Sequence, residues 1–325
     1  DGGFSETTTA SFSTDMYLGA VDGGTSNEDD QTMAGYSFQI DLNTSFTGED
    51  SLDISIDAGN SGGAGTVEFD GNSGGDALAV DGVSYTFPIG SKTTAFVGDN
   101  TDGSLLFNTA CVYGGPSNTL DDCGNNYASL NGGAGTAFGA TYDVGNGFTG
   151  SFGYTGDGGA NGLMTEEGDD AIAYQVAYAA DNYGVSFTYA YKENPTFNTA
   201  VTDTNVWALN GYYTPEGEGL PSISVGFEAA DSEVPSLTPN DTDSQAWFIG
   251  LQWDEVGPGT AGVAIGTKQH TVDNDTLDDE LLMYEAFYSY ELNDGMTITP
   301  LIYSKEFASS AEDETGIMVK TSFSF

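Results

Sequence analysis

The sequence contains no arginine and few basic residues of any kind. Its 325 residues include only five lysines (Lys92, Lys192, Lys268, Lys305 and Lys320) against 50 acidic residues, and the formal net charge is −45. A surface that follows nucleic-acid phosphates needs clustered Lys or Arg, and a patch that binds anionic membranes needs the same. The composition therefore excludes nucleic-acid binding and polybasic membrane attachment.

Long apolar runs are also missing, so the sequence predicts no membrane-spanning helix. The residues Asp1-Gly2-Gly3 do not begin a basic and then apolar stretch, and we expect a secretory signal to be absent or already removed. Disorder is disfavoured because 38% of residues are hydrophobic, 12% are aromatic and only 17% are charged. With 46 glycines, this composition is typical of an all-β protein with long polar loops.

The chain has two cysteines, Cys111 and Cys123, and both lie in one polar segment. This arrangement predicts a local disulfide formed in an oxidising compartment. A metal site is the weaker interpretation, because no second cysteine pair and no histidine lies nearby in the sequence.

Alternation of apolar and polar residues is the clearest pattern in the chain. Residues 36–43 and 52–57 place every apolar side chain at an even position and every polar one at an odd position, as in a strand with one apolar and one polar face. Most such segments have about ten residues, the length of a tilted strand that crosses a bilayer. The sixteen segments are 8–21, 33–46, 51–58, 79–88, 92–99, 135–144, 148–157, 171–180, 184–192, 204–213, 221–229, 244–253, 260–270, 281–292, 296–305 and 315–325.

Short and long connections alternate between these segments. Short turns such as 145–147 and 293–295 are followed by long polar loops such as 59–78 and 100–134. The pattern predicts an all-β, transmembrane, antiparallel up-and-down barrel of about 16 strands, with short periplasmic turns and long extracellular loops. A soluble β-sandwich is the competing interpretation, but rows of large apolar residues such as Trp247-Ile249-Leu251-Trp253 suit a lipid-facing surface better.

The longest loop carries a more specific resemblance. Residues 108–115 (NTACVYGG) and 118–125 (NTLDDCGN) resemble the cysteine-bearing loop of cyanobacterial Som-type porins, which are grouped with the carbohydrate-selective OprB family, and the ending 320–325 (KTSFSF) is similar to that group's closing strand. The resemblance implies a homotrimer in a Gram-negative-type, cyanobacterial outer membrane, transporting ions and carbohydrates. It also implies that the loop between strands five and six folds into the lumen. The sequence departs from this family in two respects. It shows no surface-layer-homology domain, and it has none of the arginines that are usual in the lumens of the family.

In a barrel surrounded by lipid, the polar half of each strand faces the aqueous lumen. Carboxylates in a lumen with few cations attract cations and repel anions. Lys320 is predicted to be the one lumenal cation. The residues predicted to face inward are Asp15, Gln39, Asp41, Asn43, Asp53, Asp57, Glu228, Glu285 and Lys320.

Residues 100–134 are the predicted constriction. Its acids are Asp102, Asp121 and Asp122, and Tyr113 and Tyr127 are predicted to line its wall. A disulfide closing about a dozen residues would hold the loop in one shape, with about 3 kcal/mol from loop entropy. The alternative is an external cap away from the ion path.

Sequence motifs for catalysis and cofactor binding are weak. The repeated Gly59-Asn60-Ser61-Gly62-Gly63 and 71–75 match G-x-S-x-G but lie on no strand-turn-helix elbow, and the single histidine, His270, lies in another strand. The acids at 273–275 and 278–280 lack the spacing of an EF-hand loop. We therefore expect no enzyme activity, no cofactor and no dedicated metal site, with divalent cations bound only loosely.

These observations predict that residues 1–325 form one domain, an outer-membrane porin. It would pass small hydrophilic solutes and inorganic ions by diffusion, with a preference for cations, and its partners would be outer-membrane lipid and its own copies in a homotrimer. Two alternatives stay open. One is an adhesin or surface receptor anchored by a barrel, and the other is a secreted, Ca²⁺-dependent β-rich binding protein.

Overall fold

The structure is a computed structural model of the whole chain. Helices long and apolar enough to span a membrane do not occur in the part of the chain that it describes. The described residues are 7–24, 31–61, 68, 71–72, 74–117, 119–120, 123–125, 135–158, 162–165, 168–193, 202–233, 241–272, 280–307 and 312–325.

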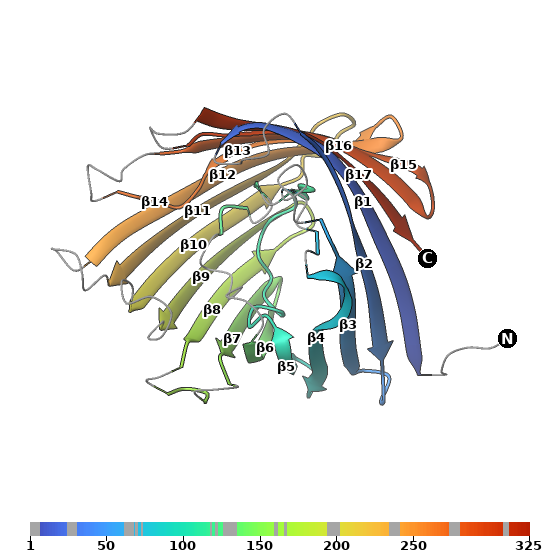
Figure 1. Cartoon of the computed structure of the whole chain (residues 1–325). Helices are drawn as coiled ribbons and strands as arrows, with labels where there is room; N and C mark the ends of the chain where they lie inside the picture. Colours follow the sequence, from blue (N-terminus) through green and yellow to red (C-terminus); the bar gives the residue numbers. More distant parts are fainter. Residues whose placement is uncertain are drawn as a thin grey trace.

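The described residues form one closed antiparallel sheet (Figure 1). Each strand pairs with its neighbours in chain order, and β17 pairs with β1 to close the barrel. The strands are β1 (Thr8–Gly24), β2 (Thr32–Thr44), β3 (Ser51–Gly59), β4 (Gly75–Ile89), β5 (Thr93–Thr101), β6 (Gly135–Gly145), β7 (Phe148–Gly156), β8 (Asp170–Ala179), β9 (Tyr183–Glu193), β10 (Asp203–Tyr213), β11 (Ser222–Glu233), β12 (Asp241–Val256), β13 (Gly259–Thr267), β14 (His270–Thr271), β15 (Leu282–Asn293), β16 (Met296–Lys305) and β17 (Glu312–Ser324).

The predicted barrel of sixteen strands is confirmed. The two-residue β14 extends β13, since both pair with β12, and only β13 continues the wall to β15. The wall therefore has sixteen positions, and every predicted segment overlaps one of them. Period-two alternation located the strands because the two faces of this wall meet different surroundings along its whole length.

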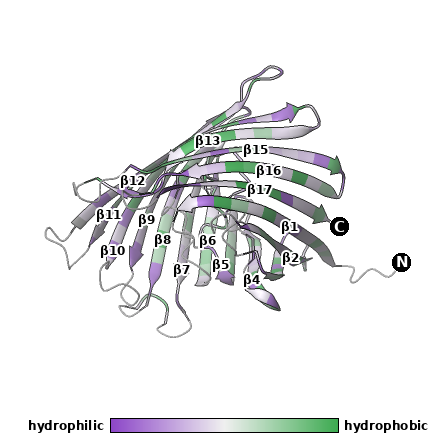
Figure 2. Ribbon diagram, turned by 45° about the horizontal axis from the view of Figure 1, so that its top comes forward, coloured by the Kyte–Doolittle hydropathy of each residue, from purple (hydrophilic) through white to green (hydrophobic). Residues whose placement is uncertain are grey.

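The outward face of the wall is apolar, and the inward face is polar or small except where large apolar side chains such as Phe248, Phe287 and Tyr303 form a buried cluster. In β1, Met16 and Leu18 are 55% and 52% exposed on the outside, whereas Tyr17 and Gly19 point inward and are buried. The same alternation continues around the sheet, and Figure 2 shows hydrophobic residues alternating with hydrophilic ones along the strands. An exposed apolar band on a closed sheet is the surface that a lipid bilayer requires.

The short connections all lie at one end of the barrel, and the β2–β3 turn is held by one carboxylate. Asp50 Oδ1 accepts hydrogen bonds from the Phe46 and Thr47 amides at 2.9 and 2.8 Å and from the Ser45 hydroxyl at 2.9 Å. Its Oδ2 accepts the Tyr85 hydroxyl of β4 at 2.7 Å. These donors favour the charged form, and they hold the pKa of Asp50 well below its usual range.

Acid is therefore expected to weaken this turn. A carboxyl whose folded pKa is depressed stabilises the fold above its unfolded pKa of about 3.9, and this contribution is lost as the pH falls below that value. The Asp50→Asn variant should melt at a lower temperature than the parent at pH 7, with a smaller difference at pH 3. The temperature at which the heat-modifiable band shifts on electrophoresis measures both. A difference that does not shrink in acid would contradict the argument.

Candidate pore constriction

Within 102–125, the described residues 102–117, 119–120 and 123–125 run along the inner wall of the barrel (Figure 1), and they are called the inner segment below. Their backbone amides donate hydrogen bonds to polar side chains that point inward from β7, β8, β9, β11 and β12. The contacts are Gly103 to Thr155 of β7 (2.8 Å), Asn108 to Gln175 of β8 (2.6 Å), Ala110 to Ser186 of β9 (2.9 Å), Val112 to Ser224 of β11 (3.0 Å) and Gly114 to Gln252 of β12 (2.9 Å).

These wall residues were not singled out in the sequence. Gln175, Ser186 and Ser224 are nearly inaccessible, because the inner segment covers them. A backbone without a regular ladder of its own must find partners for its amides, and here the wall supplies them. One signal in the sequence could have identified these wall residues, namely the type of polar residue on each strand. The polar faces of β7–β12 are mainly uncharged, whereas those of β2 and β3 are rich in aspartate.

Close approach between the inner segment and the wall depends on glycines at the contact. A Cβ at Gly226 of β11 would overlap the carbonyl oxygen of Cys123, and Asn210 of β10 donates its amide to that same oxygen at 3.0 Å. A Cβ at Gly250 of β12 would lie 2.7 Å from the ring of Tyr113. The wall is therefore shaped to receive this segment, since any larger residue at Gly226 would displace it.

Tyr113 anchors the middle of the inner segment. Its ring packs against Phe248 and Phe287, with centroids 5.3 and 5.9 Å away, and its hydroxyl donates to Glu285 Oε1 at 2.6 Å. The Ser117 hydroxyl donates to the other oxygen of Glu285. Burial, together with the neighbouring carboxylate of Glu285, raises the pKa of Tyr113.

Three of the predicted pore-lining residues are buried, so the prediction is wrong for them. Tyr113 is 5% exposed, Glu285 4% and Glu228 0%. A side chain without solvent contact does not line a water-filled path, so these three belong to the contact between the inner segment and the wall. The prediction failed because alternation assigns a residue to the inward face but does not indicate what covers that face.

Alkaline pH is expected to loosen the inner segment through Tyr113. The raised pKa means that the Tyr113 contribution to docking is complete below its unfolded pKa of about 10 and falls as the pH rises above it, by about 1.4 kcal/mol per pH unit. Single-channel recordings between pH 8 and pH 11 should therefore show increasing current noise in the parent. The Tyr113→Phe variant, which has no ionisable hydroxyl, should show no such increase, and an identical rise in both would refute the role of Tyr113.

Lysines at two inward positions correct the prediction that Lys320 is the one lumenal cation. Lys305 of β16 is buried and forms an ion pair with Glu68, whose other oxygen accepts the Thr119 hydroxyl at 2.6 Å. Lys192 of β9 shares the inward face with Ala190, within electrostatic range of Glu228 and Asp102. Lys320 also faces inward, because it pairs in register with Tyr17. Lys192 and Lys305 therefore have carboxylates beside them on the covered part of the wall.

The cysteine prediction is confirmed, since Cys111 and Cys123 form a disulfide. The bridge joins the part of the inner segment that lies on β9 to the part that lies on β10 and β11. It therefore links two stretches of backbone that are docked separately on the wall.

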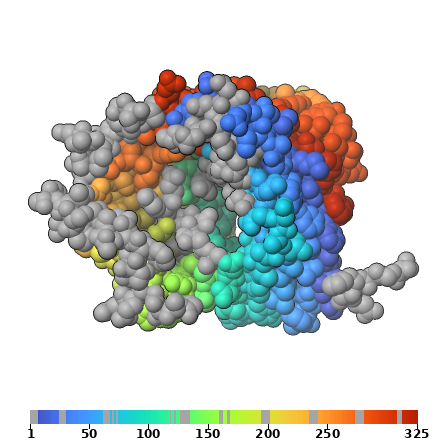
Figure 3. Space-filling model, in the orientation of Figure 1, coloured from blue at the N-terminus to red at the C-terminus, as the bar shows by residue number. Residues whose placement is uncertain are grey.

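The opposite part of the lumen is acidic. Asp15 of β1, Asp41 of β2, and Asp53 and Asp57 of β3 share the inward face by register. Neutral donors hold two of them, with the Gln39 amide 2.8 Å from Asp41 and the Ser51 hydroxyl 2.9 Å from Asp53. Asn43 also donates to Asp53. Figure 3 shows the mouth of the barrel hollowed in this view.

Asp81 joins this group and was missed in the sequence. It lies at a bulge in β4, where Ser55 pairs with Gly82 and the next residue, Ile56, pairs with Val80. Asp57 and Asp41 lie close enough to Asp81 to act on it electrostatically. The bulge shifts the alternation, so the outward apolar residues change from even (Leu78, Val80) to odd (Val83, Tyr85). This change from even to odd positions was the signal in the sequence that could have identified Asp81 as part of the group.

The acidic wall is defined here as Asp15, Asp41, Asp53, Asp57 and Asp81. Within the described residues, none of these five carboxylates has an ion-pair partner. The wall therefore presents uncompensated negative charge to the lumen.

Several predictions fall on residues whose structure is not described. Asp121, Asp122 and Tyr127 of the predicted constriction and the acidic run 273–279 lie outside the described ranges. Asp102 is described, and its carboxylate accepts the amide and hydroxyl of Ser104 at 2.8 and 2.9 Å. Within the described ranges, no group of three or more His, Cys, Asp or Glu side chains is placed to hold a metal ion.

The serine and histidine considered for catalysis have structural contacts. The Ser61 hydroxyl donates to the carbonyl of Asn72 at 3.0 Å, which ties the two G-x-S-x-G copies together. The His270 ring nitrogens lie 3.3 Å from the Gln245 amide and 3.2 Å from the Lys268 carbonyl.

Comparison with solved structures identifies this architecture. The chain is similar to OprB of Pseudomonas putida, with 11% identity, a TM-score of 0.69 and coverage of 98% of this chain and 94% of that one. The trimer form of OmpT, an outer-membrane protein of Vibrio cholerae, gives 11% identity, a TM-score of 0.69 and coverage of 98% and 100%. An anion-selective porin from Comamonas acidovorans gives 14% identity and a TM-score of 0.62, and the match covers 98% of this chain and 99% of that one.

The chain has the fold of outer-membrane porins. No protein-family model and no curated protein matches its sequence. At 11–14% identity, the similarity to porins establishes the architecture of the barrel, and the chemistry of the lumen has to be argued from this chain's own residues.

Proposed function

We propose that this protein is an outer-membrane porin, a passive channel for small hydrophilic solutes and inorganic ions with a preference for cations. The observation that carries the proposal is a closed sixteen-stranded wall with an exposed apolar outer face and with aspartates of β1–β3 on its inward face. Barrels of 16–18 strands enclose enough space for an aqueous channel, whereas eight strands would be enough for an anchor. No catalytic step is involved.

The inner segment is proposed to set the width of the channel. It occupies the lumen along β7–β15, so solutes would pass between it and the acidic wall. The wall behind the segment is covered and its lysines lie beside carboxylates, whereas the aspartates of the wall facing the path have no ion-pair partner among the described residues. This separation of charge supports the preference for cations.

The oligomeric state and the origin are part of the same proposal. A homotrimer and a place among the cyanobacterial Som-type porins follow from the resemblance of the cysteine-bearing loop and the closing strand, and a trimer form of the Vibrio cholerae protein supports the trimer. The same resemblance suggests transport of carbohydrates. Native mass spectrometry of detergent-purified protein would give the subunit number directly, and liposome swelling in sugars would test carbohydrate passage.

Single-channel recording in a planar bilayer under a KCl gradient tests the central claim. Stepwise conductance with a reversal potential toward that of K⁺ is the expected result. Steps with a reversal potential toward that of Cl⁻ would retain the channel and overturn the cation preference. No steps at all from folded protein would overturn the porin proposal and favour an adhesin anchored by its barrel.

A further inference from the structure

The connection between β3 and β4 returns to the inward face of β2. The Asn72 amide donates to the Ser37 hydroxyl at 2.6 Å, and the Ser61 hydroxyl donates to the Asn72 carbonyl at 3.0 Å. Ser37 lies on the same face of β2 as Asp41 and is 8% exposed. Two points of this connection, Ser61 and Asn72, are therefore fixed on the lumen side of the wall, next to the acidic wall.

Glu68, which lies between those two points in the chain, reaches β16. It forms the ion pair with Lys305 and accepts the Thr119 hydroxyl at 2.6 Å. In the wall, β2 and β16 are separated by β1 and β17, whose inward side chains Tyr17 and Met318 are 4% and 1% exposed. The described residues 60–61, 68 and 71–72, called the crossing connection below, therefore extend on the lumen side from β2 to β16 and meet the inner segment.

Lys305 supplies the charge that keeps Glu68 in this buried place. The two residues are 7% and 5% exposed, and the buried carboxylate of Glu285 lies within electrostatic range of both. Lys268 is also in range of Glu68, but it is exposed and forms no ion pair with any described residue. Removing one partner of a buried ion pair leaves an uncompensated charge, and such a charge is far more stable in water. Without Lys305, the carboxylate of Glu68 would therefore move out of the contact.

We propose that Lys305 is a positioning residue of the channel. Its ion pair with Glu68 holds the crossing connection over the lumen, and this connection narrows the path that the inner segment and the acidic wall leave open. The inference deepens the proposed function, and it rests on that function only where ion conduction is the readout.

Single-channel conductance in 1 M KCl tests the position of the crossing connection, because charges are strongly screened where the Debye length is about 3 Å. Lys305→Met should raise the conductance about twofold, since a displaced connection widens the path. Parental conductance in this variant would overturn the proposal.

A double variant separates the ion pair from the mere shape of the Lys305 side chain. Lys305→Met/Glu68→Met should return the conductance to the parental value, because an apolar pair can replace a buried ion pair without leaving an unpaired charge. The surroundings suit it, since the Lys305 ammonium lies 5.3 Å from the centroid of the Tyr303 ring. A double variant that conducts like Lys305→Met would overturn the role of the ion pair. Lys268→Met removes the same charge from the same region and should keep the parental conductance.

Proteolysis reports the position of Glu68 without any conduction of ions. Endoproteinase Glu-C cleaves after glutamate, and the fragments are identified by mass spectrometry. Cleavage after Glu68 should be about tenfold faster in Lys305→Met than in the parent or in Lys268→Met, because cleavage follows the population in which the site is released. Equal rates in the three proteins would overturn the proposal.

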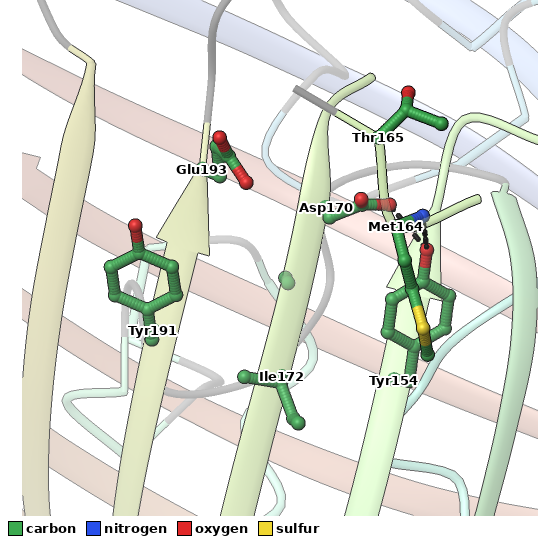
Figure 4. Close-up of a pocket in the computed structure, with 8 residues that line it drawn as sticks. Tyr154, Met164, Thr165, Asp170, Ile172, Tyr191 and Glu193 are labelled. Atoms are coloured by element: carbon green, nitrogen blue, oxygen red, sulfur yellow. Dashed lines mark hydrogen bonds between the residues drawn. The ribbon is translucent and has the colours of Figure 1, made fainter. Parts of the chain in front are cut away.

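A carboxylate–tyrosine contact on the outer face of the barrel provides a second control (Figure 4). The Asp170 carboxylate accepts the Tyr154 hydroxyl beside a cavity of about 300 Å³. Because β7 and β8 pair in register from Phe148 to Gly156, this contact holds no distant segment. Asp170→Asn should therefore change neither the conductance nor the cleavage after Glu68. Changes equal to those of Lys305→Met would overturn the proposal, since loss of any carboxylate contact would then be enough.

Heat-modifiable electrophoresis confirms that each variant is folded, and the two readouts separate the proposals. A barrel that conducts, with parental conductance and parental cleavage in Lys305→Met, overturns only the role of Lys305. A barrel in which Lys305→Met accelerates cleavage after Glu68, but which does not conduct, overturns only the channel.

Discussion

Neutralising the acidic wall is expected to remove most of the cation preference of the channel. The variant Asp41→Asn/Asp53→Asn/Asp57→Asn/Asp81→Asn should lower the K⁺/Cl⁻ permeability ratio about tenfold in 0.1 M KCl, because fixed charges along a narrow low-dielectric passage produce potentials of several kT. The effect should shrink in 1 M KCl, where the Debye length is about 3 Å instead of about 10 Å. Reversal potentials under a salt gradient measure both.

The matched control neutralises four acids at the short turns. Asp181→Asn/Glu216→Gln/Glu218→Gln/Asp294→Asn removes the same charge from exposed residues at one end of the barrel. It should change the permeability ratio much less, because these side chains lie outside the narrow passage. Equal shifts in the two variants would show that net charge, not the acidic wall, sets the selectivity.

Displacing the inner segment is expected to raise conductance several-fold. Gly226→Val puts side-chain atoms where the carbonyl oxygen of Cys123 now lies and where Asn210 donates its hydrogen bond. The barrel itself should persist, because its ladder does not depend on that contact. The amides that lose partners on the wall would be hydrated in an aqueous lumen, so detachment costs less than it would in an apolar core. Single-channel conductance in 1 M KCl is the measurement.

Gly211→Val in the neighbouring strand β10 is the control. A Cβ at Gly211 would have its nearest neighbour 3.5 Å away, so the change adds the same atoms without an overlap. Its conductance should equal that of the parent. A Gly226→Val channel with parental conductance would show that the inner segment does not limit the flow of ions.

The sequence by itself determined the wall of the barrel. The alternation of apolar and polar residues is a local property of the sequence. A strand between lipid and water repeats it along its whole length, so the strands around 36–43 and 52–57 were located correctly. The proximity of Cys111 and Cys123 in the chain also predicted their disulfide.

Only the tertiary structure decided which inward residues meet the lumen. Tyr113 and Glu285 are 172 residues apart in the chain, and no local pattern connects them. Gly226 is one of 46 glycines, and its role exists only because Cys123 lies against it. Alternation distinguishes inside from outside, but the covering of Glu285 and the exposure of the acidic wall depend on where a distant segment packs.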